Sequence, residues 1–225
     1  MFIREGLYDQ KIICPLCSTE YSTKKVLSRM AKVKGVDGDF RAHYSGLNPS
    51  HYAINVCLEC GFAFMEKTKP QISSSQRSRY IADVISRWRP RTLTEGRSVQ
   101  EGIVAFKLAI FCAQYIEEPA RTVGGLCLQL AWLYRELEDE EQEMRFLRDA
   151  LDFYRHAYET DNTIELDGRL TYLLGELYRR VGDERSAVFF FNQLIHDKQA
   201  TPKYVRLARQ QWELLRQPQM QAVAR

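Results

Sequence analysis

Two pairs of cysteines are the residues in this sequence best suited to carry chemistry. Cys14 and Cys17 enclose the segment CPLC, and Cys57 and Cys60 enclose CLEC. A gap of two residues lets both thiolates of a pair face one ion, and two such pairs complete a tetrahedral shell of four sulfurs. Gly61 follows the second pair and can adopt the positive φ angle that directs backbone amides toward sulfur. The sequence therefore predicts one structural Zn²⁺ ion bound by these four cysteines.

The spacer between the two pairs is longer than in most zinc ribbons. It contains 39 residues (18–56), whereas ribbons commonly use about 15–20. The longer loop costs about 0.7 kcal/mol of closure entropy, and a structural zinc ion contributes about 10 kcal/mol or more. The site is therefore expected to form if the spacer folds as a hairpin of its own. We interpret Asp37 and Asp39 in this spacer as turn residues, and His43 and His51 as surface or turn residues.

The pattern of apolar residues changes along the chain. Residues 1–66 contain short alternating segments and turn residues, which predicts a small ribbon-like β domain. Residues 67–98 are predicted to form a linker with one short amphipathic helix, whose apolar face contains Ile81, Val84, Ile85 and Trp88. Residues 99–217 follow a helical period, and 218–225 are expected to form a flexible tail.

Helices are predicted at 99–117, 121–137, 140–159, 163–181, 184–197 and 202–216, the first capped by Ser98 with Glu101 and the fifth by Asp183. The predicted fold class is α+β, mostly α, with the zinc-ribbon-like domain followed by antiparallel helices.

Two helical segments are related in sequence. LQLAWLYREL (128–137) aligns with YLLGELYRRV (172–181), and Gly182, Ala187, Phe191 and Leu194 follow near the spacing of a tetratricopeptide repeat. An ordinary antiparallel bundle is the alternative. If the repeat register holds, six residues face the groove between the helices: Leu128, Trp132, Arg135, Tyr172, Glu176 and Arg179.

Charge and composition limit the class of protein. The net charge is +3, with an excess of Lys and Arg in residues 1–100 and of Asp and Glu in residues 101–225. We find no apolar run of the roughly 18–20 residues that a membrane span needs, and the charged N-terminal segment MFIREGLYDQ is unlike a signal peptide. The sequence therefore predicts a cytoplasmic protein without a membrane partner. Thiols stay reduced in the cytoplasm, which argues against two disulfides.

The order and spacing of several motifs resemble those of a bacterial family known only as a domain of unknown function. The resemblance runs through CPLC, DGDF, YSGLNPSHYAINVCLECGFA, AWLYREL and LLGELYRRVGD, over about residues 10–215. It implies an N-terminal part with four cysteines joined to tetratricopeptide-like helices. It implies no reaction, partner or process.

Three functions are compatible with these patterns. The first is a protein-interaction adaptor that binds a peptide or protein in the helical groove. The second is nucleic-acid binding through the basic segments KKVLSRMAKVKG and RSRYIADVISRWRPR, where Tyr80 and Trp88 can stack on bases. The third is a thiol redox sensor that releases zinc on oxidation. An enzyme is not expected, because a shell of four thiolates leaves zinc no position for substrate. We prefer the adaptor, and the sequence does not specify an oligomeric state.

Overall fold

The structure is a computed structural model that describes residues 6–68, 70–89, 96–160 and 168–223, with the backbone alone over residues 217–223. Short strand pairs come first in the chain and helices follow. The fold class is therefore α+β and mostly α, as predicted from the sequence.

The strands of the described residues form three separate antiparallel pairs. They are β1 (Leu7–Ile13), β2 (Glu20–Val26), β3 (Ala31–Val36), β4 (Ala42–Gly46), β5 (Ile54–Val56) and β6 (Ala63–Met65). Each odd-numbered strand pairs with the strand that follows it. Short 3-10 helices cover Ser28–Met30, Pro49–Tyr52 and Ile85–Arg87 (η1, η2 and η3). The hairpin β3–β4 lies inside the spacer between the cysteine pairs, as the condition stated for that spacer requires, although β2 of the same spacer pairs outside it with β1.

The helices follow the predicted order closely. They are α1 (Ser74–Asp83), α2 (Val99–Tyr115), α3 (Ala120–Glu136), α4 (Glu140–Thr160), α5 (Arg169–Arg180), α6 (Glu184–His196) and α7 (Pro202–Val223). The predicted capping box is present, because Ser98 and Glu101 each bond the other's backbone amide, and Asp183 caps α6. The predicted start of the helix at 163–181 lies outside the described residues. Helix α7 continues to Val223, past its predicted end at residue 216.

The predicted apolar face of the short helix is wrong in detail. Helix α1 ends at Asp83, so the residues after it leave the helical register. Ile81 is 49% exposed, whereas its neighbour Tyr80 is only 1% exposed. The Tyr80 ring packs edge-on against Phe62, with ring centroids 5.5 Å apart. Tyr80 therefore makes the main core contact of α1, whereas Val84, Ile85 and Trp88 lie beyond the end of the helix and pack partly buried against the core.

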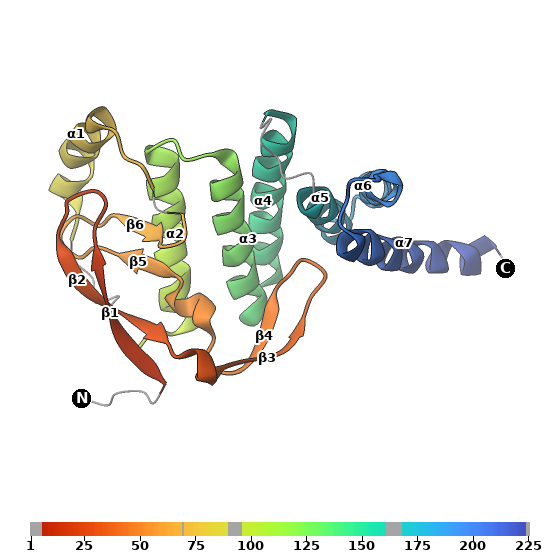
Figure 1. The fold of residues 1–225 in the computed structure, drawn as a ribbon, viewed down its shortest axis with the longest axis horizontal. Coiled ribbons are helices and arrows are strands. Elements are labelled where there is room, and N and C mark those ends of the chain that lie inside the picture. Colours follow the sequence, from red (N-terminus) through yellow and green to blue (C-terminus); the bar gives the residue numbers. More distant parts are fainter. Residues whose placement is uncertain (1–5, 69, 90–95, 161–167, 224–225) are drawn as a thin grey trace.

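One hydrophobic core joins the N-terminal strands to the helices. Buried residues such as Leu16, Phe62, Phe106 and Leu130 belong to a single cluster that extends from the cysteine segments into α2, α3 and α4. In Figure 1, α2, α3 and α4 stand side by side, and α5, α6 and α7 continue toward the C-terminus. Each helix from α2 to α7 packs against the next. The strand pairs are thus attached to the helices and do not form a detached unit.

The last three helices pack around a second buried cluster. It contains Tyr172, Ala187, Phe191, Leu194 and Ala208. A Cβ atom on Gly175 would lie 2.6 Å from the Phe191 ring, so the missing side chain allows α5 and α6 to approach. None of the helices within the described residues combines the length and apolar character needed to cross a bilayer.

Candidate functional site

The four cysteines of the two pairs meet at one point in the structure. The sulfur atoms of Cys14 and Cys60 are 3.6 Å apart, as are those of Cys17 and Cys57. All four sulfurs lie within 4.8 Å of one another. Three of these side chains are buried, and that of Cys17 is partly exposed. The arrangement can hold a metal ion.

Each cysteine pair sits on a backbone turn of the same form. In the first, the Ser18 amide donates to the Cys14 carbonyl, and in the second, the Gly61 amide donates to the Cys57 carbonyl, both at 2.9 Å. Ser18 and Gly61 have φ angles of 62° and 73°. The left-handed conformation predicted for Gly61 is present, and Ser18 adopts it despite the steric cost that a side chain carries there.

The crowded sulfurs oppose one another's ionisation. Hydrogen bonds from Cys14 and Cys60 lower the pKa of Cys57. The pKa values of the two neighbouring thiols are raised. The hydrogen bond with Cys57 raises the pKa of Cys14, and the hydrogen bond with Cys14 raises the pKa of Cys60. Thiolates this close repel each other unless a cation lies among them. A bound divalent cation would remove this conflict and allow all four to ionise.

The segment that contains α1 and η3 covers both cysteine turns. The Arg77 guanidinium donates to the Pro15 carbonyl at 3.0 Å, and the Trp88 indole donates to the Leu58 carbonyl at 2.7 Å. A Cβ atom on Gly61 would lie 2.5 Å from the Trp88 ring. Residues 74–88, which we predicted as part of a linker, therefore hold the backbone of the candidate metal centre.

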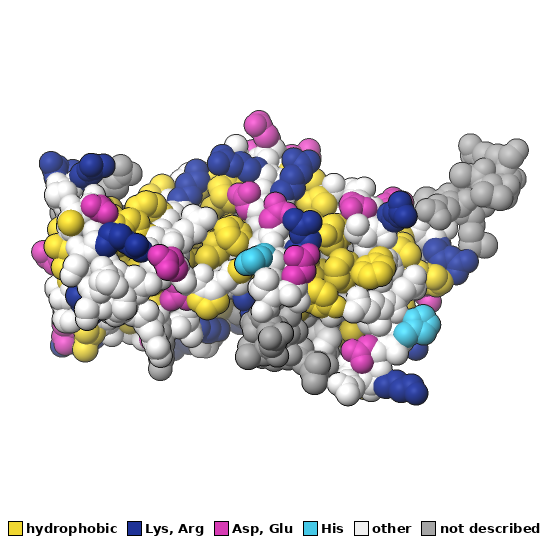
Figure 2. All heavy atoms as spheres, turned by 90° about the horizontal axis from the view of Figure 1, so that it is seen from above, with side chains coloured by type: hydrophobic (Ala, Val, Ile, Leu, Met, Phe, Trp, Pro, Cys, Tyr) yellow, Lys and Arg dark blue, Asp and Glu magenta, His cyan; other side chains and the backbone are white. Residues whose placement is uncertain are grey.

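Several of the side chains considered for nucleic-acid binding make contacts within the protein instead. Tyr80 is buried, and its hydroxyl lies 3.4 Å from the Cys112 sulfur. Arg79 donates to the Tyr115 carbonyl and forms an ion pair with Glu117. On the face of the molecule in Figure 2, Lys and Arg side chains are interspersed with Asp and Glu side chains and do not form one basic patch. The described contacts thus leave Tyr80 unable to stack on a base.

The β3–β4 hairpin, residues 31–46, reaches the helices through its turn. We refer to this hairpin as the arm and to its turn, residues 37–40, as the tip. The turn is closed by the Phe40 amide, which donates to the Asp37 carbonyl at 2.9 Å. The tip contacts α3 and α5 at residues that we name the recess: Trp132, Arg135, Tyr172, Glu176, Arg179 and Arg180. Segments far apart in the sequence therefore meet here.

Asp39 is the centre of this contact. Its side chain has no exposed surface. Its Oδ2 atom lies 2.7 Å from Nη2 of Arg135 and 3.3 Å from Nε of Arg180, and it accepts a hydrogen bond of 3.0 Å from the Trp132 indole. One carboxylate therefore joins α3 to α5.

Further charges complete the network around Arg135. Its guanidinium also contacts Asp37 at 2.8 Å and Glu143 at 2.6 Å. Burial lowers the pKa of Arg135, but the hydrogen bonds and charges of Asp39 and Glu143 outweigh burial and raise it. At Asp37, burial raises the pKa, and the hydrogen bonds from His43 and Arg135 more than reverse that effect. The charged forms are thus favoured on both sides of the contact.

Phe40 supplies the apolar part of the tip. Its ring centroid lies 5.3 Å from that of Tyr172 and 6.1 Å from that of Tyr204, and the Arg169 guanidinium lies over it at 5.6 Å. Its φ angle is 70°, a left-handed value that costs a bulky residue on the order of 1 kcal/mol or more. The packing of the ring retains this conformation.

The structure brings most of the predicted groove residues around the tip. Trp132 and Arg135 bond it directly, Tyr172 packs on Phe40, and Glu176 lies beside Gly38. Arg179 forms an ion pair with Glu176 and interacts with Asp39 of the tip through charge. Leu128 belongs to the hydrophobic core.

Sequence reasoning missed that the chain supplies the occupant of this groove. Asp37 and Asp39 do form a turn, as interpreted, but they also pair with Arg135 and Arg180. The available signal was the opposite charge of DGDF and of the groove arginines. Of the two histidines, His43 contacts Asp37, and His51 contacts Glu136 at 2.9 Å. Cys112 and Cys127, the two remaining cysteines of the chain, are buried in the hydrophobic core.

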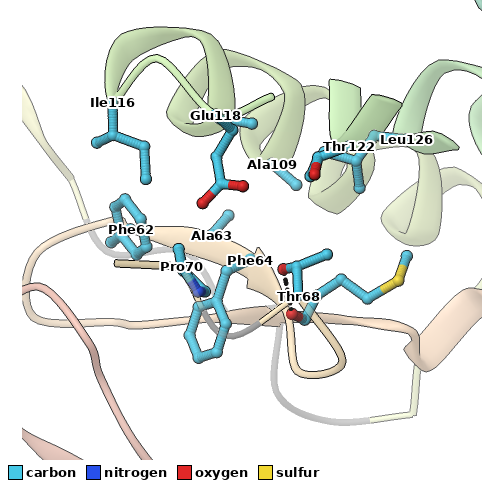
Figure 3. A pocket seen from close by; sticks show the side chains of 12 residues that line it. Phe62, Ala63, Phe64, Thr68, Pro70, Ala109, Ile116, Glu118, Thr122 and Leu126 are labelled. Atoms are coloured by element: carbon cyan, nitrogen blue, oxygen red, sulfur yellow. Dashed lines mark hydrogen bonds between the residues drawn. The ribbon is translucent and has the colours of Figure 1, made fainter. Parts of the chain in front are cut away.

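A small hollow between β6 and the turn from α2 to α3 contains one carboxyl group. Figure 3 shows the Glu118 side chain pointing toward Phe62, Ala63 and Pro70. Burial raises the pKa of Glu118, and a hydrogen bond with Thr122 acts against it. The free volume of about 10 Å³ can hold a single water at most. This hollow is too small to accept a substrate.

Comparison with protein families assigns most of the chain. Residues 7–215 match the model of a family described as "Uncharacterized protein conserved in bacteria (DUF2225)". The chain belongs to this bacterial family. The match includes both cysteine pairs, the arm and all the recess residues, so the two features described above lie within the family's domain. Searches of curated proteins and of solved structures gave no match.

Proposed function

We propose that this member of the family is a non-enzymatic protein-interaction adaptor, located in the cytoplasm, in which one zinc ion organises the N-terminal part and the helices bind a segment of a partner protein. The observation that carries the proposal is the occupied recess. It already holds a turn of polypeptide through buried ion pairs and aromatic contacts at Asp39 and Phe40. Stacked helix pairs commonly bind peptide segments on such surfaces.

The distances among the sulfurs support zinc as the ion. Zinc bonds thiolate at about 2.3 Å, so a tetrahedral shell places its sulfurs about 3.8 Å apart. In the structure the sulfurs of Cys14 and Cys60, and those of Cys17 and Cys57, are each 3.6 Å apart, and all four lie within 4.8 Å of one another. Four soft thiolates in a tetrahedral site favour zinc over hard cations. Four protein ligands leave no open coordination position, so the ion would stabilise the fold and take no part in a reaction.

Cross-linking in a bacterium that carries the protein tests the adaptor function. The tagged chain is cross-linked in cells, purified, treated with nuclease and analysed by mass spectrometry. We expect at least one protein to be recovered reproducibly, with cross-links on α3, α5 or the arm. Recovery that is lost after nuclease treatment would favour the nucleic-acid alternative. Cross-links confined to the chain itself under all growth conditions would contradict the adaptor function.

A further inference from the structure

The arm is attached to the helices mainly through its tip. Residues 32–36 of β3 are all exposed, with Val33 at 54% and Val36 at 60%. A Cβ atom on Gly35 would meet nothing within 4 Å. By contrast, Asp39 at the tip is fully buried. An isolated two-stranded hairpin is marginally stable in water, so the position of the arm depends on what its tip contacts.

The recess has a definite chemical preference. Arg135 and Arg180 both face the Asp39 carboxylate and are 14% and 20% exposed. Glu143 and Glu176 also pair with these arginines, but two partly buried guanidinium groups at one point still favour an acidic occupant there. Tyr172 accepts an aromatic ring. A Cβ atom on Gly38 would lie 2.7 Å from a Glu176 carboxylate oxygen, so the residue between the two acids has to be small.

We propose that the recess is a recognition site for a turn of a partner protein with the order acidic residue, glycine, acidic residue, aromatic residue, and that the tip is an internal competitor for it. This inference rests on the adaptor function and names the partner chemistry. The tip is tethered, so its effective concentration is on the order of millimolar or higher. A partner therefore binds weakly while the arm is in place and more tightly when the arm is lifted, because apparent affinity scales with the population of the open form.

Two matched glycines in the arm allow the tip to be displaced without changing the recess. In Gly38→Glu the new side chain meets the Glu176 carboxylate and repels it, which expels the tip. In Gly35→Glu the same side chain enters open space on the same hairpin, so the tip stays bound. Both variants are studied as full chains, with metal content and helical circular dichroism compared with the wild type.

The probe is a fluorescein-labelled peptide with the sequence of residues 31–46, and its binding is followed by fluorescence anisotropy. We expect the Gly38→Glu chain to bind this peptide at least about tenfold more tightly than the Gly35→Glu chain does. A peptide with both Asp37→Asn and Asp39→Asn should lose this binding, as should addition of Arg135→Glu to the Gly38→Glu chain. If Gly38→Glu does not fold, Phe40→Ala replaces it, because it weakens the tip and leaves the recess intact.

Three results would overturn the inference. They are equal binding by the two glutamate variants, equal binding of the acidic and the amidated peptides, and no binding to a folded chain whose tip is displaced. Dimers of the wild type that Gly38→Glu abolishes would assign the recess to the arm of a second copy instead. The adaptor function is tested by a different result. Cross-links to a partner outside the recess would support it even if the peptide does not bind the recess.

Discussion

Removal of the Asp39 carboxylate should be one of the most damaging single changes to this protein. Truncation of one member of a buried ion pair costs about 3–5 kcal/mol, because the other charge is left buried. Arg135, which is 14% exposed, keeps Asp37 at 2.8 Å and Glu143 at 2.6 Å, so the loss should lie at the lower end of this range. We expect Asp39→Ala to lower the free energy of unfolding by about 3 kcal/mol.

The coupling between Asp39 and Arg135 separates this interaction from general damage. In a double-mutant cycle of Asp39→Ala with Arg135→Met, measured by urea unfolding of the metal-loaded protein, we expect a coupling of about 1.5–3 kcal/mol. Asp39→Asn should lie between wild type and Asp39→Ala, because the amide oxygen can still accept from Trp132. Asp9→Ala is the control, because Asp9 pairs with Lys24 at an exposed position and its loss should leave stability almost unchanged. A coupling below about 0.5 kcal/mol would refute the role given to the tip.

Two further predictions concern the cysteine turns and the response to acid. Gly61→Ala should destabilise the protein by about 2 kcal/mol or more, because the new Cβ would overlap the Trp88 ring and Gly61 has a φ angle of 73°. Ser18→Gly should stabilise the protein by about 0.5–1 kcal/mol, because it removes the strain of a serine in the left-handed conformation. Thermal unfolding of the metal-loaded variants measures both effects, and loss of stability in Ser18→Gly would contradict the reasoning. At Glu136, burial raises the pKa, but the hydrogen bonds from His51 and Asn48 lower it below its ordinary value near 4.5. A carboxyl group whose pKa is lowered by folding stabilises the protein above its pKa in the unfolded chain, and this stability is lost as the pH falls. The difference in Tm between wild type and Glu136→Gln should therefore be largest near neutral pH and shrink below about pH 4.5. A difference that grows in acid would contradict this assignment.

Features set by local sequence could be predicted, because their causes lie within a few residues. The Cys-x-x-Cys spacing allows both sulfurs of a pair to face the same point. The Ser98 and Asp183 caps determine where two of the helices begin. The positive φ of Gly61 follows from the form of the turn. The same local reasoning failed for α1, where a helical period was extended past Asp83 and Tyr80 was overlooked.

The occupied recess could not be predicted from local patterns. Asp39 and Arg135 are 96 residues apart, and an Asp-Gly-Asp segment is most often an ordinary turn. The sequence pattern predicted that the groove arginines bind another protein, because nothing in the helical period identifies a ligand elsewhere in the same chain. Contacts between two elements that are each correctly predicted depend on how the spacer folds back over the helices, and residue periodicity does not contain that information.

The central claim is that sulfurs from two distant segments share one zinc ion and thereby fix the N-terminal part of the fold. X-ray absorption at the zinc edge, on protein purified without added metal, tests it most directly. We predict one zinc ion per chain with four sulfur neighbours at about 2.3 Å and no nitrogen or oxygen in the shell. A shell with fewer than four sulfurs, or a well-folded chain without a stoichiometric metal ion, would contradict the account.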